Sequence, residues 1–419
     1  SENVAKGMES WLKEAEGLGV ANIRTYEAAI QAWVRTGTSS GLANAEALAL
    51  HVLERAKDDE LNIYPRVQTV LPILVGLYRT GEIDRLQEWN DRLSNVGFNS
   101  DSRVRGLVIA ACRQAQKVHL DNQNFNEANA EARKSLKLFK ELANNVKEFH
   151  GGTGPPVFLD SEVVRTVIEA CGSIRRRDYS VDRMLQVVYI TNDTIRHLKR
   201  VRNEAEGDCQ RTKQQLAHLA GSVAGIYSIV VSRMNEKRDG NVVAERAADV
   251  EALLRFVWEN NVLHKTMTPI AYRDGFAYRH RGRRPTVKDV TDLCLGVVDG
   301  CSRNPGRGPP SADKIRLALT CFDLACYVDR GASTSRTKRK NELHRRIITL
   351  LGSIENEAER TSLLGHVAKR VKREACVDIN VINDAVASVL SSGKGKPSTG
   401  RSPWAKKRKQ GRRLSLKKS

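Results

Sequence analysis

The hydrophobic residues of this chain follow a helical spacing along most of its length. Apolar positions recur every three or four residues, and apolar and polar residues do not alternate over four or more positions as they would in a strand. The pattern therefore predicts an all-α chain. Beyond residue 120 the predicted helices are 124–149, 158–176, 180–200, 203–235, 241–263, 286–302, 311–329, 339–353, 355–373 and 378–391.

Two segments near the start of the chain repeat one another. Ile23–Gly37 and Val67–Gly81 are offset by 44 residues, carry a threonine near their beginning and end in the same Arg-Thr-Gly. Each is typical of a helix that ends at a glycine in the left-handed conformation. A second helix is predicted after each segment, near 42–58 and 82–96, which indicates two helical hairpins.

A four-residue signature recurs further along the chain. It consists of an aliphatic residue, any residue, alanine or glycine, and then a cysteine, tryptophan or aliphatic residue. The copies are Ile30–Trp33, Leu74–Leu77, Ile109–Cys112 and Ile168–Cys171, with looser ones at Val223–Ile226 and Val298–Cys301. A small residue between bulky neighbours lets a partner helix approach closely. The signature therefore predicts tight helix packing, for example at Ala32 and Gly76.

The first 115 residues resemble the pentatricopeptide repeat family, whose helical hairpins act in organellar RNA metabolism. The resemblance is carried by Thr25, Tyr26, Ile30, Ala32, Trp33, Gly37, Pro65, Thr69, Leu74, Tyr78 and Gly81. The step of 35 residues from Leu74 to Ile109 also equals the family period. The resemblance implies an α-solenoid of helical hairpin repeats, RNA as the partner, and a mitochondrial or plastid location.

The resemblance also implies where bases would be recognised. In the family, one helix of each repeat faces a base, and the matching repeat-code positions here are Glu27 with Arg66 and Leu71 with Asp101. Leu71 has no hydrogen-bonding group, and Glu27 can neutralise Arg66. We therefore expect the array to contact phosphates without reading bases one by one.

The net charge favours a polyanionic partner. Lys and Arg number 69 against 49 Asp and Glu, which gives +20, and eleven of these cations lie in 393–419, where there is no acidic residue. This composition predicts a basic tail that is disordered when free. The expected organisation is PPR-like repeats at 1–150, divergent hairpins at 151–263, a basic connection with one helix at 264–310, a helical region at 311–392 and the tail at 393–419.

Two segments are the strongest candidates for RNA contact, because aromatic rings stack on bases while guanidinium and ammonium groups bind phosphates. The first candidate set is Tyr272, Arg273, Phe276, Tyr278, Arg279, Arg281, Arg283 and Arg284. The second, in the tail, is Trp404, Lys406, Lys407, Arg408, Lys409, Arg412 and Arg413.

Several functional classes find no support in the sequence. The longest uncharged apolar stretch, Leu219–Ser232, is shorter than the roughly 20 residues of a membrane helix. The eight cysteines show no zinc-like spacing, and no phosphate-binding loop or catalytic grouping can be assembled. We expect neither a metal nor another cofactor, and no enzymatic activity. The chain begins at Ser1, which indicates a removed leader or a fragment.

The sequence predicts a non-catalytic RNA-binding helical-repeat protein that acts in organellar RNA processing, stability or ribosome function. Single-stranded or ribosomal RNA would be its partner. The alternative is a protein–protein scaffold whose basic tail alone contacts nucleic acid. A further alternative concerns location, because the basic residues at 406–413 are also typical of a nuclear import signal.

Overall fold

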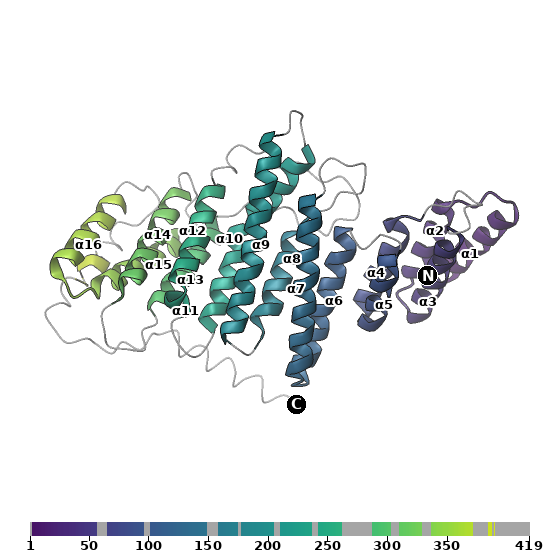
Figure 1. Ribbon diagram of the computed structural model, residues 1–419, viewed down its shortest axis with the longest axis horizontal. Coiled ribbons are helices and arrows are strands. Elements are labelled where there is room, and N and C mark those ends of the chain that lie inside the picture. Colours follow the sequence, from purple (N-terminus) through teal and green to yellow (C-terminus); the bar gives the residue numbers. More distant parts are fainter. Residues whose placement is uncertain are drawn as a thin grey trace. The chain divides into compact units, whose positions relative to one another are not determined.

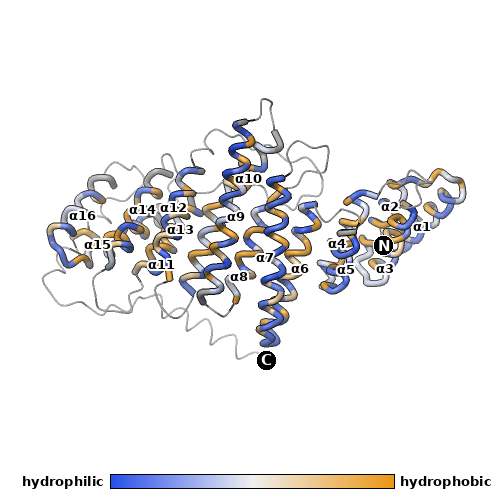
Figure 2. Tube along the Cα trace, viewed as in Figure 1, coloured by the Kyte–Doolittle hydropathy of each residue, from blue (hydrophilic) through white to orange (hydrophobic). Residues whose placement is uncertain are grey.

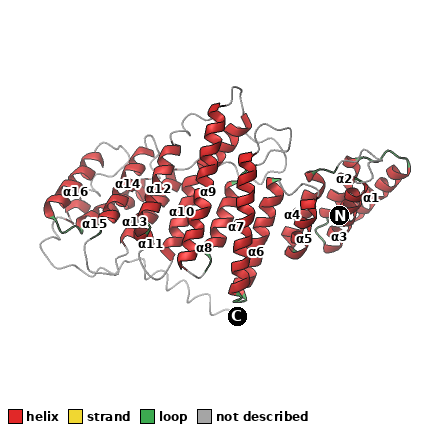
Figure 3. Cartoon of the chain, viewed as in Figure 1, coloured by secondary structure: helices red, strands yellow, loops and turns green. Residues whose placement is uncertain are grey.

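All regular structure in the described part of the chain is helical. A computed structural model describes residues 2–56, 65–95, 101–148, 158–174, 177–204, 210–236, 242–261, 287–302, 310–328, 337–371, 384–387 and 389. These residues form α-helices and short turns and contain no strand (Figure 3). The prediction of an all-α fold is confirmed.

The chain forms two compact units, Ser1–Pro305 and Gly306–Ser419. The helices of the first unit are α1 Glu2–Gly17, α2 Ile23–Val34, α3 Ser39–Arg55, α4 Val67–Thr80, α5 Ile83–Asn95, α6 Ser102–Asp121, α7 Phe125–Glu148, α8 Ser161–Gly172, α9 Arg177–Glu204, α10 Gln210–Glu236, α11 Val242–Glu245, α12 Ala247–Asn261 and α13 Val287–Ser302. The second unit contains α14 Ala312–Val328, α15 Thr337–Gly352 and α16 Glu357–Val371.

The predicted helix at 241–263 is interrupted. A turn at Arg246 separates α11 from α12, and the guanidinium of Arg246 binds Asp182 of α9 at 2.5 Å. The predicted helix at 378–391 lies largely outside the described residues, which are helical at 384–387 and 389.

From α1 to α12 each helix packs on the next helix in sequence, and many also pack on the next but one. The even-numbered helices form a continuous series in which α2 contacts α4, α4 contacts α6, α6 contacts α8 and α8 contacts α10. Helix α13 continues the series by packing on α10. Helices α6 to α10 stand side by side (Figure 1), and hydrophobic and hydrophilic residues alternate along them as amphipathic packing requires (Figure 2).

The recurrent four-residue signature lies on this series of helices. Its six copies fall on α2, α4, α6, α8, α10 and α13, one on each. The first and fourth residues of every copy are buried: Ile30, Trp33, Leu74, Leu77, Ile109, Cys112, Ile168, Cys171, Val223, Ile226, Val298 and Cys301. The signature therefore marks the helices that carry the continuous contact, including its two looser copies.

Capping interactions explain the threonine shared by the two early repeats. The side chain of Asn22 accepts hydrogen bonds from the amides of Arg24 and Thr25, and the Thr25 hydroxyl accepts one from the Asn22 amide at 3.4 Å. In the second repeat the Thr69 hydroxyl accepts a hydrogen bond from the Arg66 amide at 3.1 Å. The shared threonine thus satisfies a backbone donor where each helix begins.

Both shared glycines adopt the left-handed conformation, but only Gly81 caps its helix. Gly37 and Gly81 have φ angles of +69° and +77°. Gly81 is the C-cap of α4, and behind it the amide of Glu82 donates to the carbonyl of Leu77 at 2.9 Å. Helix α2 ends at Val34 with Arg35 as its C-cap, so the predicted glycine cap is confirmed for α4 and is wrong for α2, where Gly37 lies two residues beyond the cap.

The cysteines of the described residues are free and buried. Cys112, Cys171, Cys294, Cys301 and Cys321 form no disulfide. Burial raises the pKa of both Cys112 and Cys171 to about 12. These thiols act as small apolar core residues.

The second unit is a smaller helical assembly. Helix α15 packs on α14 and on α16. The rings of Phe322 and His344 meet edge to face, with centroids 5.2 Å apart, and Ile347 and Ile348 are buried in the same core.

We expect Gly76→Leu to destabilise the first unit. A Cβ atom at this position would lie 2.3 Å from Cδ2 of the buried Leu42 on α3, so the added side chain would overpack a tight contact at a cost of about 1–3 kcal/mol. Thermal denaturation measures the loss. Gly7→Leu on α1 is the control, since nothing lies within 4 Å of its Cβ position. Equal melting temperatures for the Gly76→Leu and Gly7→Leu variants would refute the assignment.

Ala32 is only half-buried, so Ala32→Leu should cost less stability than Gly76→Leu.

We expect Gly81→Ala to destabilise through the backbone alone. A Cβ atom there would meet Gln114 Nε2 at an ordinary 3.6 Å, but φ stays in the left-handed region, which costs about 1–2 kcal/mol for an L-residue. Gly81→Asn should cost less, because asparagine tolerates this conformation. Denaturant titration of both variants tests the order; an alanine variant as stable as the asparagine variant contradicts it.

Candidate nucleic-acid interface

The residues predicted to contact RNA in the two basic segments lie outside the described residues. These are Tyr272, Arg273, Phe276, Tyr278, Arg279, Arg281, Arg283, Arg284, Trp404, Lys406, Lys407, Arg408, Lys409, Arg412 and Arg413. The four repeat-code positions are described, and each can be compared with its expected role.

Glu27 and Arg66 bind one another. Arg66 donates from Nη2 to Glu27 Oε2 at 2.6 Å and from Nε to Oε1 at 3.3 Å. The Thr69 hydroxyl donates to the same Oε1 at 3.0 Å. Glu27 is only 9% exposed, so its carboxylate serves to join α2 to the beginning of α4. The mutual neutralisation expected from the sequence is present.

Leu71 and Asp101 are also used within the fold. Leu71 is 7% exposed and belongs to the apolar side of α4. Asp101 is 2% exposed and caps α6, where its side chain accepts hydrogen bonds from the Arg103 amide at 2.8 Å and from the Arg103 guanidinium at 2.9 and 3.1 Å. Glu27, Leu71 and Asp101 are thus occupied within the fold, while the exposed Arg66 is paired with Glu27.

Three ion pairs in the first hairpins share one spacing that the sequence analysis missed. Glu16 binds Arg55, Glu27 binds Arg66, and Glu46 binds Arg85, and in each case the partners are 39 residues apart. They join α1 to α3, α2 to α4 and α3 to α5, so each pair connects next-but-one helices. A search for acidic and basic residues at a fixed separation could have found this signal.

Aromatic residues complete these junctions. Tyr26, one of the residues that carry the family resemblance, donates its hydroxyl to Glu16 and accepts a hydrogen bond from Arg55 at 2.7 Å. Trp33 donates from Nε1 to Glu9 at 3.0 Å. These rings are buried, and their polar atoms are bound to acidic side chains within the fold.

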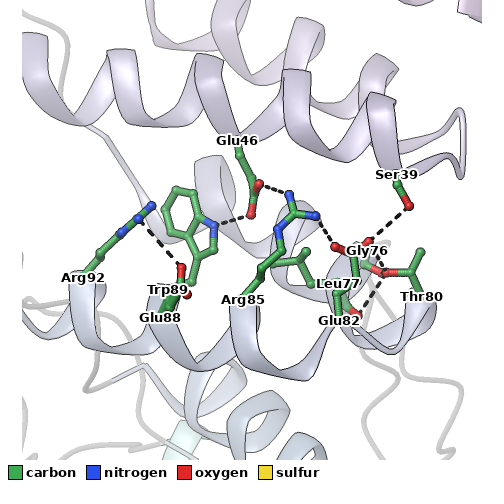
Figure 4. Close-up of polar contacts among 10 residues, drawn as sticks. All are labelled: Ser39, Glu46, Gly76, Leu77, Thr80, Glu82, Arg85, Glu88, Trp89 and Arg92. Atoms are coloured by element: carbon green, nitrogen blue, oxygen red, sulfur yellow. Dashed lines mark hydrogen bonds and ion pairs between the residues drawn. The ribbon is translucent and has the colours of Figure 1, made fainter.

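The junction between α3 and α5 shows the same arrangement (Figure 4). Trp89 donates from Nε1 to Glu46 at 2.7 Å, and Arg85 binds both Glu46 and Glu82. Glu82 also accepts hydrogen bonds from Ser39 at 3.4 Å and Thr80 at 3.2 Å. The charges of the first hairpins are therefore largely neutralised between helices.

Helix α7 carries basic residues along one side. Arg133, Lys137, Lys140 and Lys147 are four, three and seven residues apart, a spacing that places them on one face, here named the α7 basic face. Arg133 and Lys137 are exposed and Lys140 is half-buried. Among the described residues no acidic side chain forms an ion pair with these three cations.

Two acidic residues in the middle of α7 contact its neighbour α6. Glu141 binds Arg105 of α6, and Glu131 lies against the Cys112 thiol of α6. The other two acidic residues, Glu127 and Glu148, are exposed near the ends of the helix. The middle of the helix thus separates these two carboxylates from Arg133, Lys137 and Lys140. The α7 basic face is the clearest candidate for phosphate contact in the described part of the chain.

The described residues offer little for other chemistry. They contain no group of three His, Cys, Asp or Glu side chains arranged to hold a metal ion. None of their helices has both the length and the apolar character needed to cross a membrane.

No family model matches the chain, and no curated protein sequence matches it significantly.

We expect Glu27→Ala to reduce stability without changing the ranking of RNA sequences that the protein binds. The substitution leaves Thr69 and Arg66 without their acceptor, at a cost of about 1–3 kcal/mol. Glu27→Gln should cost less, because its amide oxygen can still accept from Thr69. Thermal denaturation measures the first effect, and binding to a panel of RNA sequences measures the second.

The glutamine variant separates the structural role from a code role. If Glu27 read a base, Glu27→Gln would alter the preferred sequence while the fold stayed stable. That result would contradict the structural assignment.

Proposed function

We propose that this protein is a non-catalytic RNA-binding helical-repeat protein that holds RNA through its phosphates. The observation that carries the proposal is the α7 basic face, in which Arg133, Lys137 and Lys140 form no ion pair with an acidic side chain among the described residues, on a chain of net charge +20. An uncompensated row of this kind suits a polyanion, whose phosphates carry no sequence information.

The stacked helices support a solenoid of hairpin repeats as the framework. The four-residue signature recurs on six helices that contact one another in order, and the Glu–Arg pairs join next-but-one helices at a constant spacing. Repeat proteins contact mainly their nearest neighbours in this way. The framework would present RNA-binding surfaces without forming a catalytic site.

The place of action follows from the resemblance of the first 115 residues to the pentatricopeptide repeat family. It points to organellar RNA processing, stability or ribosome function, in a mitochondrion or plastid. The basic residues at 406–413 support the nucleus as the alternative.

A second candidate, a protein–protein scaffold, is favoured by the exposed side of α1. Val4 and Trp11 are seven residues apart on this helix and Leu18 follows it, and their exposed fractions are 60%, 68% and 71%. Apolar residues gathered on one side are typical of a protein contact. The two candidates differ in the effect of deleting residues 393–419, which should leave residual RNA binding if the α7 basic face holds RNA and should abolish it if the tail alone contacts nucleic acid.

We expect deletion of residues 393–419 to weaken RNA binding without changing the order of preferred sequences. The segment holds eleven Lys and Arg residues, and each one that contacts single-stranded RNA adds about −0.7 to the slope of log affinity against log salt. Binding measured at several salt concentrations should therefore show a lower affinity and a shallower slope. An unaltered salt slope for the deletion variant would mean that the tail does not bind RNA. Absence of RNA binding by the full chain at every salt concentration would refute the proposed function.

A further inference from the structure

The positive surface of α7 continues onto α9. Lys147, at the end of the α7 basic face, binds Asp193 of α9. Arg196 and Arg200 follow at the spacing of one helical face, and both are exposed. The six cations Arg133, Lys137, Lys140, Lys147, Arg196 and Arg200 form a surface that we name the α7–α9 band.

The one acid within the band is dominated by its cations. The hydrogen bond from Lys147 lowers the pKa of Asp193, and the charges of Lys147, Arg200 and Arg196 lower it further, while burial acts in the opposite direction. Asp193 is thus held as a carboxylate and joins the two helices. Because it neutralises only one charge, the band keeps an excess of positive charge.

The composition of the band is unsuited to unpaired bases. Proteins that hold single strands without sequence preference stack successive bases on aromatic rings. The α7 basic face has none, and its remaining positions are the polar Asn126 and Asn144. On α9 the two exposed rings are engaged within the fold: the hydroxyl of Tyr189 is bound to Asp249 of α12, and the guanidinium of Arg183 lies over the ring of Tyr179. Nothing in the band provides a row of stacking surfaces.

The same composition suits a double helix. Paired RNA is recognised mostly through its shape, its phosphates and its 2′-hydroxyl groups, which cations and amides can bind. The α7 basic face extends over 15 residues, from Arg133 to Lys147, or about 21 Å at the rise of an α-helix. A straight row of that length can reach phosphates on both strands of a duplex.

Resting on the proposed RNA binding, we propose that the α7–α9 band binds the sugar–phosphate backbone of double-helical segments of folded RNA. The helices that carry the band are the odd-numbered ones, whereas the repeat-code positions belong to the even-numbered helices and the residues before them. Backbone binding on α7 and α9 therefore needs no free side chain at those code positions.

The test compares two triple variants of the full chain that lose the same charge. The band variant carries Arg133→Gln, Lys137→Gln and Lys140→Gln, and it keeps Lys147 because that residue binds Asp193. The control variant carries Arg24→Gln, Arg35→Gln and Arg79→Gln, three exposed arginines within or directly after α2 and α4. The probes are an RNA duplex of about 16 base pairs, one of its strands alone, and vesicles containing phosphatidylserine.

We expect the band variant to lose affinity for the duplex and the control variant to keep it. Three lost contacts make the salt slope about 2.7 units shallower, so between about 50 and about 200 mM salt the wild type loses about 40-fold more affinity than the band variant. The single strand should bind the wild type and the band variant with similar affinity.

Other results would overturn the inference. Equal losses for the two variants would show that only net charge matters, and a loss confined to the single strand would assign the band to unpaired RNA. Loss of vesicle binding with duplex binding retained would assign it to a membrane surface. In each case the proposed RNA-binding function could still stand, whereas a wild type that binds neither RNA probe would refute both proposals.

Discussion

Contact between next-but-one helices is the constraint on which the first unit depends. An amphipathic hairpin buries only part of its apolar surface within itself, so each even-numbered helix must also cover the next helix of its series. The buried ends of the four-residue signature supply this contact from α2 to α13. Gly76 permits one of the closest approaches in the unit, against Leu42. A larger side chain at Gly76 would separate helices that depend on this contact to cover their apolar sides.

Packing between next-but-one helices also determines which charged side chains are paired and which remain at the surface. In the first hairpins an acid and a base 39 residues apart meet between next-but-one helices, so packing brings them together and neutralises them. In the middle of α7, Glu131 and Glu141 contact α6, whereas Arg133 and Lys137 are exposed. Positive charge that packing cannot pair remains at the surface, and the part of the chain with the clearest repeats is therefore not the part best suited to phosphates.

Much of the fold could be predicted because its signals are local. The helices follow from apolar spacing, the end of α4 follows from Gly81, and the stacked series follows from a short recurrent signature. The turn at Arg246 was not predicted, because nothing in the apolar spacing of 241–263 interrupts a helix there. Its contact with Asp182 depends on packing between helices distant in sequence.

The candidate site was harder to predict for the same reason. The composition indicated aromatic and arginine-rich segments as candidates, because each of their residues can be identified in the sequence without knowledge of the fold. The α7 basic face is recognisable only when four positions are placed on one helical surface and the acids between them are known to face α6. Similarly, the pairing of Glu27 with Arg66 could be anticipated because the family resemblance placed them together, whereas Glu46 and Arg85 had no such guide.

Irregular spacing between repeats is compatible with binding to the RNA backbone, but it is not compatible with reading one base per repeat. Copies of the signature are separated by 44, 35, 59, 55 and 75 residues. Reading one base per repeat requires each repeat to advance the protein by the same step along the RNA, because a side chain must meet a base edge at each step. Phosphates form a continuous row of equivalent charges, so a cation on a long helix such as α7 can meet one without a fixed register. Longer helices and connections of unequal length would then not reduce the affinity for RNA. The code positions would be free to take the structural roles that Glu27, Leu71 and Asp101 have in this fold.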